Sequence, residues 1–238
     1  MKDHEINEAL ESAARQPYTV HPEVLDRIAS SINSSLHPVR PTPSARVLTA
    51  GLFLVCTAVA LTGAWRSGFF GFQVLGIAQR VIILSVLAIL TWIAARELVG
   101  QWTPGSRHSL APRWLIALFS ATLLVTFALL FNDYHATRFV SAGVVCLLVG
   151  VLHAIPAAGI AAWLLKRGLA VEPVSAGAIA GTFGGLSGVM MLELHCPNLE
   201  APHVLFWHVA VVPVSAALGA LAGWAISTWK RGNFPIPH

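Results

Sequence analysis

Residues 139–165 read FVSAGVVCLLVGVLHAIPAAGIAAWLL and contain no Asp, Glu, Lys or Arg. An apolar run of roughly 18 residues or more can cross the ~30 Å hydrocarbon layer of a membrane as a helix. Within that layer, only helices and closed barrels satisfy their own backbone hydrogen bonds. This stretch therefore predicts a transmembrane helix.

Five further stretches share this character, on both sides of the first. They lie at about residues 47–65, 77–95, 114–131, 173–192 and 204–229. The chain of 238 residues is 55% hydrophobic and only 11% charged, a composition that fits no soluble domain of this length. The sequence predicts an all-α fold, a six-helix transmembrane bundle preceded by a short amphipathic helical segment.

This pattern divides the chain into three regions. We expect a partner-binding segment at residues 1–44, the transmembrane domain at 45–231 and a short tail at 232–238. Loops rich in Lys and Arg face the cytoplasm. With a cytoplasmic N-terminus, all 15 Lys and Arg residues lie on that side except for three, which are Arg66, Arg80 and Arg138. Both termini are then cytoplasmic, and the net charge of +4 reflects topology and no direct contact with nucleic acid.

The segment before the first span carries an apolar stripe. Leu25, Ile28, Ile32 and Leu36 recur at helical spacing, and Pro22 stands where that helix would begin. The segment is too small to bury a core alone. A helix that lies on a bilayer surface needs a basic polar face, and this one is acidic or neutral. We therefore expect the stripe to dock onto a partner protein, with the bilayer surface as the alternative.

Two of the three cysteines are predicted at the same face of the membrane. Counting about 20 residues back from Lys166 places Cys146 about 30 Å away, at the outer interface. Cys196 lies in the last outward loop. Both would face an oxidising compartment, in which disulfides persist. We expect a paired role for them, whereas Cys56 in the first span is interpreted as a packing residue.

Three histidines lie in or beside the last outward loop on this same side, namely His195, His203 and His208. Thiolate and imidazole ligands suit a borderline-soft ion such as zinc, copper or cadmium. The spacing of these residues matches no standard zinc module, and interfacial histidines bonded to water or lipid headgroups are the alternative. We expect no resident cofactor, and only a transient metal ion at the outer cysteines.

Short motifs along the chain resemble those of a known family. They are Pro38-Val39-Arg40-Pro41 before the first span, Cys146, Pro156, Lys166-Arg167-Gly168, the glycine-rich fifth span, His195-Cys196-Pro197 and Trp207. Together they resemble the negative regulator of sigma-F family, six-span bacterial anti-sigma factors of the NrsF type. The resemblance covers about residues 20–230.

The resemblance implies a regulator and not an enzyme. In that family the cytoplasmic N-terminal segment holds an extracytoplasmic-function sigma factor inactive. Two periplasmic cysteines, matching Cys146 and Cys196, are implicated in sensing metal or oxidative stress. The chain would then be a bacterial inner-membrane protein whose partners are a sigma factor and the lipid bilayer. The sigma-docking stripe would be Leu25, Ile28, Ile32 and Leu36.

Two other classes of function are weighed against this one. A small metal-ion transporter or channel needs ionisable residues within several spans along a shared path. Here Glu97, Glu172 and Glu193 all lie at span ends. A membrane thiol oxidoreductase needs a shuttling cysteine pair, and the chain has no Cys-x-x-Cys. Both fit the sequence less well than a regulator.

Overall fold

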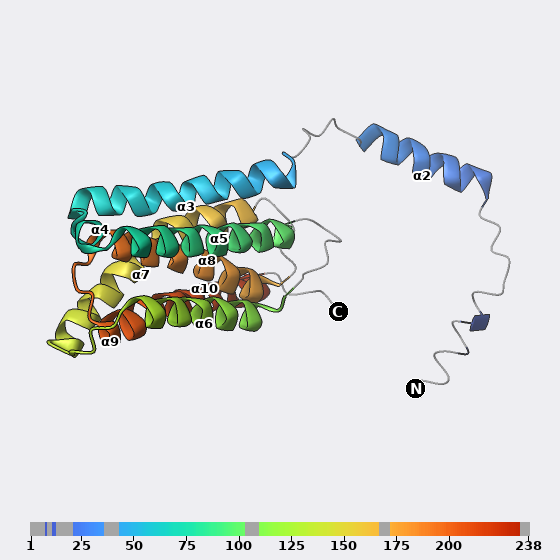
Figure 1. Cartoon of the computed structure of the whole chain (residues 1–238). Coiled ribbons are helices and arrows are strands. Elements are labelled where there is room, and N and C mark those ends of the chain that lie inside the picture. Colours follow the sequence, from blue (N-terminus) through green and yellow to red (C-terminus); the bar gives the residue numbers. More distant parts are fainter. Residues whose placement is uncertain are drawn as a thin grey trace. The chain divides into compact units, whose positions relative to one another are not determined.

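A computed structural model describes residues 8, 11–12, 21–35, 43–102, 110–166 and 172–233 of the protein. The chain divides into two units, Met1–Thr42 and Pro43–His238. In the part of the chain that is described, every element of secondary structure is a helix (Figure 1). The all-α prediction is therefore confirmed.

The first unit contains helix α2 (Pro22–Ser35). Pro22 fills the first position, where a missing N–H leaves no hydrogen bond unmade. Three residues of the predicted stripe lie on this helix: Leu25, Ile28 and Ile32 are 53%, 50% and 52% exposed. Leu36, the fourth, lies outside the described residues.

Among the described residues of the second unit, six helical spans are long and apolar enough to cross a membrane, as the sequence predicts. The first five are α3 (Ala45–Ser67), α5 (Ile77–Trp102), α6 (Pro112–Leu130), α7 (Phe139–Lys166) and α8 (Pro173–His195). The sixth runs through α9 (Ala201–His203), the π-helical turn η1 (Val204–His208) and α10 (Val209–Asn233). A short helix, α4 (Phe70–Val74), joins the first two spans. Figure 1 shows the long helices running side by side as a bundle.

Helix α8 lies at the centre of this bundle. In the most apolar stretch of α8, 83% of the residues are buried, against 22% to 33% in the corresponding stretches of the other five spans. A Cβ atom added at Gly177 would lie 2.2 Å from the carbonyl oxygen of Gly219 in α10. One added at Gly188 would lie 2.2 Å from that of Gly150 in α7. The small residues of α8 thus allow close backbone contact within one chain, as is typical of helices packed in lipid.

Helix α3, which follows the first unit in the chain, also packs on α8 and α7. Ser187 Oγ donates a hydrogen bond of 3.1 Å to the carbonyl oxygen of Cys56. At Gly63, an added Cβ would lie 2.5 Å from the ring of His153. The Nδ1 atom of that ring lies 2.8 Å from the carbonyl oxygen of Val149. These close contacts fix the register of α3 against its two neighbours.

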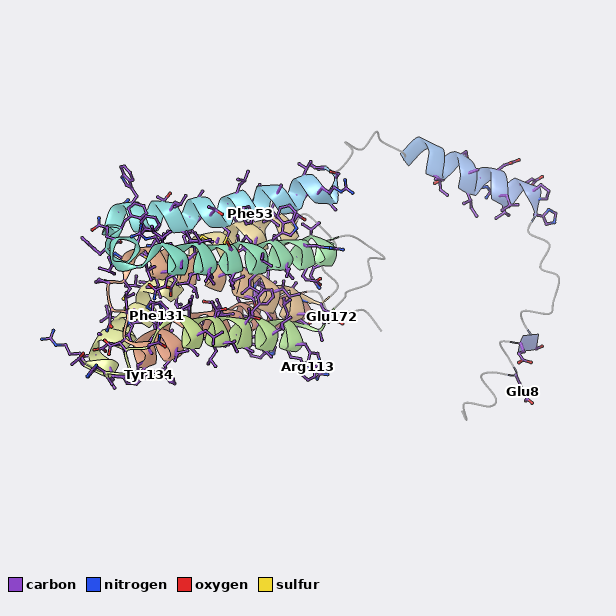
Figure 2. All side chains as sticks on the ribbon, viewed as in Figure 1. Glu8, Phe53, Arg113, Phe131, Tyr134 and Glu172 are labelled. Atoms are coloured by element: carbon purple, nitrogen blue, oxygen red, sulfur yellow. The ribbon has the colours of Figure 1, made fainter. Side chains whose placement is uncertain are left out.

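The two ends of the bundle can be told apart in the figures. Figure 2 shows Arg113 and Glu172 at one end and Tyr134 at the other. Helices α4 and α9 lie at the Tyr134 end (Figure 1), which we call the α4–α9 end. There the backbone N–H of Ala201 donates to the carbonyl oxygen of Asp133 at 2.6 Å, so the loops before α7 and before α9 are fastened together.

Candidate functional site

Two cysteines and two histidines meet at the α4–α9 end. Cys146 comes from the first part of α7, and Cys196 follows directly after α8. His203 and His208 lie at the two ends of the π-helical turn. The ligand atoms of all four residues lie within 4.8 Å of one another, and only Cys146 is not fully buried. We call this group the Cys/His cluster.

The two thiols of the cluster face each other without a covalent bond. Cys146 Sγ lies 3.6 Å from Cys196 Sγ, whereas the sulfur atoms of a disulfide are about 2.05 Å apart. Cys196 Sγ also lies 3.7 Å from Nε2 of His203. The hydrogen bond with Cys146, and then burial, raise the pKa of the Cys196 thiol, while His203 and His208 act in the opposite direction.

A buried carboxylate orients one imidazole of the cluster. His208 Nδ1 donates to Oε1 of Glu193 at 2.7 Å. In a neutral ring this bond places the proton on Nδ1 and leaves Nε2 with its lone pair. Nε2 of His208 is buried and has no hydrogen-bond partner among the described residues. In metalloproteins, a metal-binding histidine commonly donates its other ring N–H to a carboxylate in this way.

The π-helical turn places His203 and His208 on the same side. In an α-helix, residues five positions apart point about 140° away from each other. A π-helical turn closes its hydrogen bonds between residues five apart, which brings such residues back to one face. The ring centroids of the two histidines are 5.3 Å apart. This local widening of the helix is what completes the cluster.

His195 lies elsewhere, although the sequence analysis grouped it with the other two histidines. Its Nδ1 lies 3.0 Å from the carbonyl oxygen of Gly68, and its ring packs against Phe70. Gly68 has a φ of 98°, a left-handed conformation that favours glycine. His195 thus ties the end of α8 to the turn after α3 and contributes no atom to the cluster.

Sequence reasoning also missed Glu193, which it treated only as an acid at the end of a span. The signal was present, because an ionisable residue inside an apolar segment is costly and usually has a dedicated partner. Glu193 is 3% exposed, and that partner is His208. With two facing thiols and two imidazoles, the Cys/His cluster can hold a thiophilic cation, or its two thiols can be oxidised to a disulfide.

Fold and site together define a class: a six-span helical membrane protein with a buried Cys/His cluster at one end and an amphipathic helix with an exposed apolar stripe in a separate N-terminal unit. The family NrsF, negative regulator of sigma F, matches residues 33–229. The chain belongs to this family, and the resemblance found in its motifs is confirmed. It is thus a membrane-spanning member of a family of anti-sigma regulators.

One curated relative supports the same assignment over a shorter stretch. A segment of 58 residues is 36% identical to the probable anti-sigma-F factor NrsF of Azospira oryzae (strain ATCC BAA-33 / DSM 13638 / PS). This segment makes up 24% of the chain, and it spans about a quarter, 27%, of that relative's length. No solved structure matches the chain.

Proposed function

We propose that this protein is an inner-membrane anti-sigma factor that sequesters an extracytoplasmic-function sigma factor and releases it on a periplasmic metal or redox signal. Family membership supports a sigma factor as the regulated partner. The observation that carries the proposal is the apolar stripe of α2, half exposed in a unit separate from the membrane bundle.

The stripe of α2 has the chemistry of a helix that docks into an apolar groove. Leu25, Ile28 and Ile32 recur on one face and are each about half exposed. Removing apolar surface from water stabilises a complex by about 25 cal/mol per Å². Glu23 and Asp26, both exposed on the same helix, would meet a basic rim on the sigma factor.

In the proposed orientation both termini are cytoplasmic and the α4–α9 end faces the periplasm. Lys and Arg are in excess in the N-terminal segment and in the loops on the same side of the membrane, which supports this orientation. The Cys/His cluster then faces the compartment in which metal ions and oxidants first arrive, and α2 faces the cytoplasmic sigma factor.

Helix α8 supplies a physical route between the Cys/His cluster and the helix that follows the N-terminal unit. Cys196 caps α8, and its backbone N–H donates to the carbonyl oxygen of Leu192 at 2.7 Å. Ser187, nearer the start of α8, donates a hydrogen bond to the backbone of Cys56 in α3. Helix α3 follows the N-terminal unit in the chain. A signal at Cys196 can therefore shift the packing of α8 against α3. Release requires two packings that differ in affinity for the signal.

Capture of the sigma factor tests this proposal. The full chain is co-expressed with the extracytoplasmic-function sigma factors of its own genome and purified through a tag. We expect Leu25→Asp and Ile28→Asp each to reduce capture at least tenfold, because a charge cannot be buried unpaired in an apolar contact. Ser30→Asp adds the same charge away from the stripe and should retain capture. Undiminished capture by both stripe variants excludes the stripe as the contact.

A further inference from the structure

We propose that Cys146, Cys196, His203 and His208 form a four-ligand site for one thiophilic divalent cation of the zinc and cadmium class, with Glu193 as the positioning residue behind His208. This inference deepens the proposed function and rests on it only for the role of the cation as a signal. Binding of the ion itself requires no sigma factor.

The distances within the cluster match such a site. Zinc lies about 2.3 Å from thiolate sulfur and 2.0–2.1 Å from imidazole nitrogen. Around a tetrahedral ion with these bond lengths, two sulfurs are about 3.8 Å apart, and a sulfur and a nitrogen about 3.5 Å. Cys146 Sγ and Cys196 Sγ are 3.6 Å apart, and Cys196 Sγ and His203 Nε2 are 3.7 Å apart. The other pairs need only a small contraction, because no ligand atoms are more than 4.8 Å apart.

The ligand atoms are also available for coordination. His208 Nε2 is buried without a hydrogen-bond partner in the described part of the chain, and Glu193 accepts the proton on the opposite nitrogen of the same ring. Leaving a buried polar atom unpaired is unfavourable, and an ion at this point removes that cost. Both cysteines are free thiols.

The donor set selects one class of ion and one kind of role. Two thiolates and two imidazoles suit soft and borderline ions, whereas magnesium and calcium prefer oxygen ligands. Four protein ligands leave no open coordination position, as in structural zinc sites and unlike catalytic ones. An ion here would join α7 to the end of α8 and the π-helical turn, although Cys146 and Cys196 are 50 residues apart in the sequence. This arrangement suits a clamp that senses an ion and does not turn over a substrate.

Cadmium titration of the wild-type protein is the first test. The full chain is purified in detergent, reduced, freed of metal and titrated with cadmium chloride. We expect one ion per chain, an ultraviolet thiolate-to-cadmium charge-transfer band, and no band with magnesium. Saturating cadmium should slow maleimide labelling of Cys146 and Cys196 at least tenfold relative to saturating magnesium, and the fully buried Cys56 should stay unlabelled under both conditions. Unchanged labelling of the pair, or one ion shared by two chains, overturns the inference.

Substitutions then test the ligands one by one. His203→Ala and His208→Ala should each raise the Kd for cadmium at least tenfold, and Glu193→Gln should raise it about 10- to 100-fold. His195→Ala is the matched control, because it removes an imidazole at the same end of the bundle, and its Kd should stay within about twofold. Gel filtration verifies that each variant is folded, and if one is not, the wild-type titration and labelling decide. Wild-type affinity in folded His203→Ala and His208→Ala overturns the assignment.

The two proposals fail in different ways. Sigma-factor capture plays no part in the cadmium titration. Absence of capture with an intact titration overturns the proposed function alone, and capture without cadmium binding overturns this inference alone.

Discussion

His208 Nδ1 lies 2.7 Å from Oε1 of Glu193, and the two side chains are 2% and 3% exposed. In such a buried pair each group relieves the other of the cost of burial. Removing one partner is strongly destabilising because the remaining group has no replacement for water. The pair joins the end of α8 to the π-helical turn at the base of the Cys/His cluster.

Glu193→Ala should therefore destabilise the protein even without any signal. We expect a loss of roughly 1–3 kcal/mol in the free energy of unfolding, the usual cost of leaving a buried polar group unpaired. Glu193→Gln keeps an acceptor oxygen for His208 Nδ1 and should lose less. Thermal unfolding in detergent measures both. Equal midpoints for wild type and Glu193→Ala would show that the pair contributes nothing to stability.

The glycines of α8 allow a second test, on packing. In Gly188→Ala the new Cβ would lie 2.2 Å from the carbonyl oxygen of Gly150, so α7 and α8 must separate. Overpacking of this kind typically costs about 1–3 kcal/mol. At Gly159 a Cβ would meet nothing within 4 Å, so Gly159→Ala should keep or slightly raise stability. The same unfolding measurement compares the two, and similar midpoints would contradict the close contact between α7 and α8.

The sequence could predict the helical spans because hydropathy alone determines them. A run such as 139–165 cannot be exposed to water, and membrane thickness then fixes its length. The same thickness puts Cys146 and Cys196 at one depth, and their thiols are indeed neighbours. Lateral position is a different matter, since depth does not say which faces of two helices meet. The central position of α8 follows from the backbone contacts of Gly177 with α10 and of Gly188 with α7, and the sequence does not specify these partners.

The incomplete prediction of the cluster also has a physical reason. Helical periodicity assumes about 3.6 residues per turn, which would point His203 and His208 in different directions. The π-helical turn changes that period locally, and the residue types in Val204–His208 do not predict such a turn. The sequence shows Glu193 as an acid at the end of an apolar span, but only the fold identifies His208 as its partner. His195 was grouped with His203 and His208 because all three are predicted in or beside the last outward loop, which ignores the direction of a side chain at the end of a helix.

The proposed orientation predicts which loops reach the periplasm. A reporter enzyme active only in the periplasm should be active when inserted after Tyr134, an exposed residue between α6 and α7. The same reporter fused after His238 should be silent, because an even number of spans returns the chain to the cytoplasm. Comparable protein amounts on an immunoblot provide the control. Strong activity after His238 contradicts the proposed topology.

The last prediction concerns the thiols as the input of the signal. Cys146→Ser and Cys196→Ser preserve side-chain size, but a serine hydroxyl can neither form a disulfide nor replace a thiolate as a ligand for a soft ion. Each variant should retain the sigma factor in the absence of a signal, since α2 belongs to a separate unit. Each should also fail to release it on treatment with cadmium or an oxidant.

Cys56→Ser is the matched control: Cys56 is fully buried and belongs to α3, not to the cluster. It should release the sigma factor as wild type does, because a serine hydroxyl can replace the thiol as the donor to the carbonyl oxygen of Phe183 in α8, and the bond from Ser187 reaches the backbone carbonyl of residue 56. Sigma-factor capture with and without the signal measures all three variants. Normal release from both Cys146→Ser and Cys196→Ser would place the sensor elsewhere in the protein.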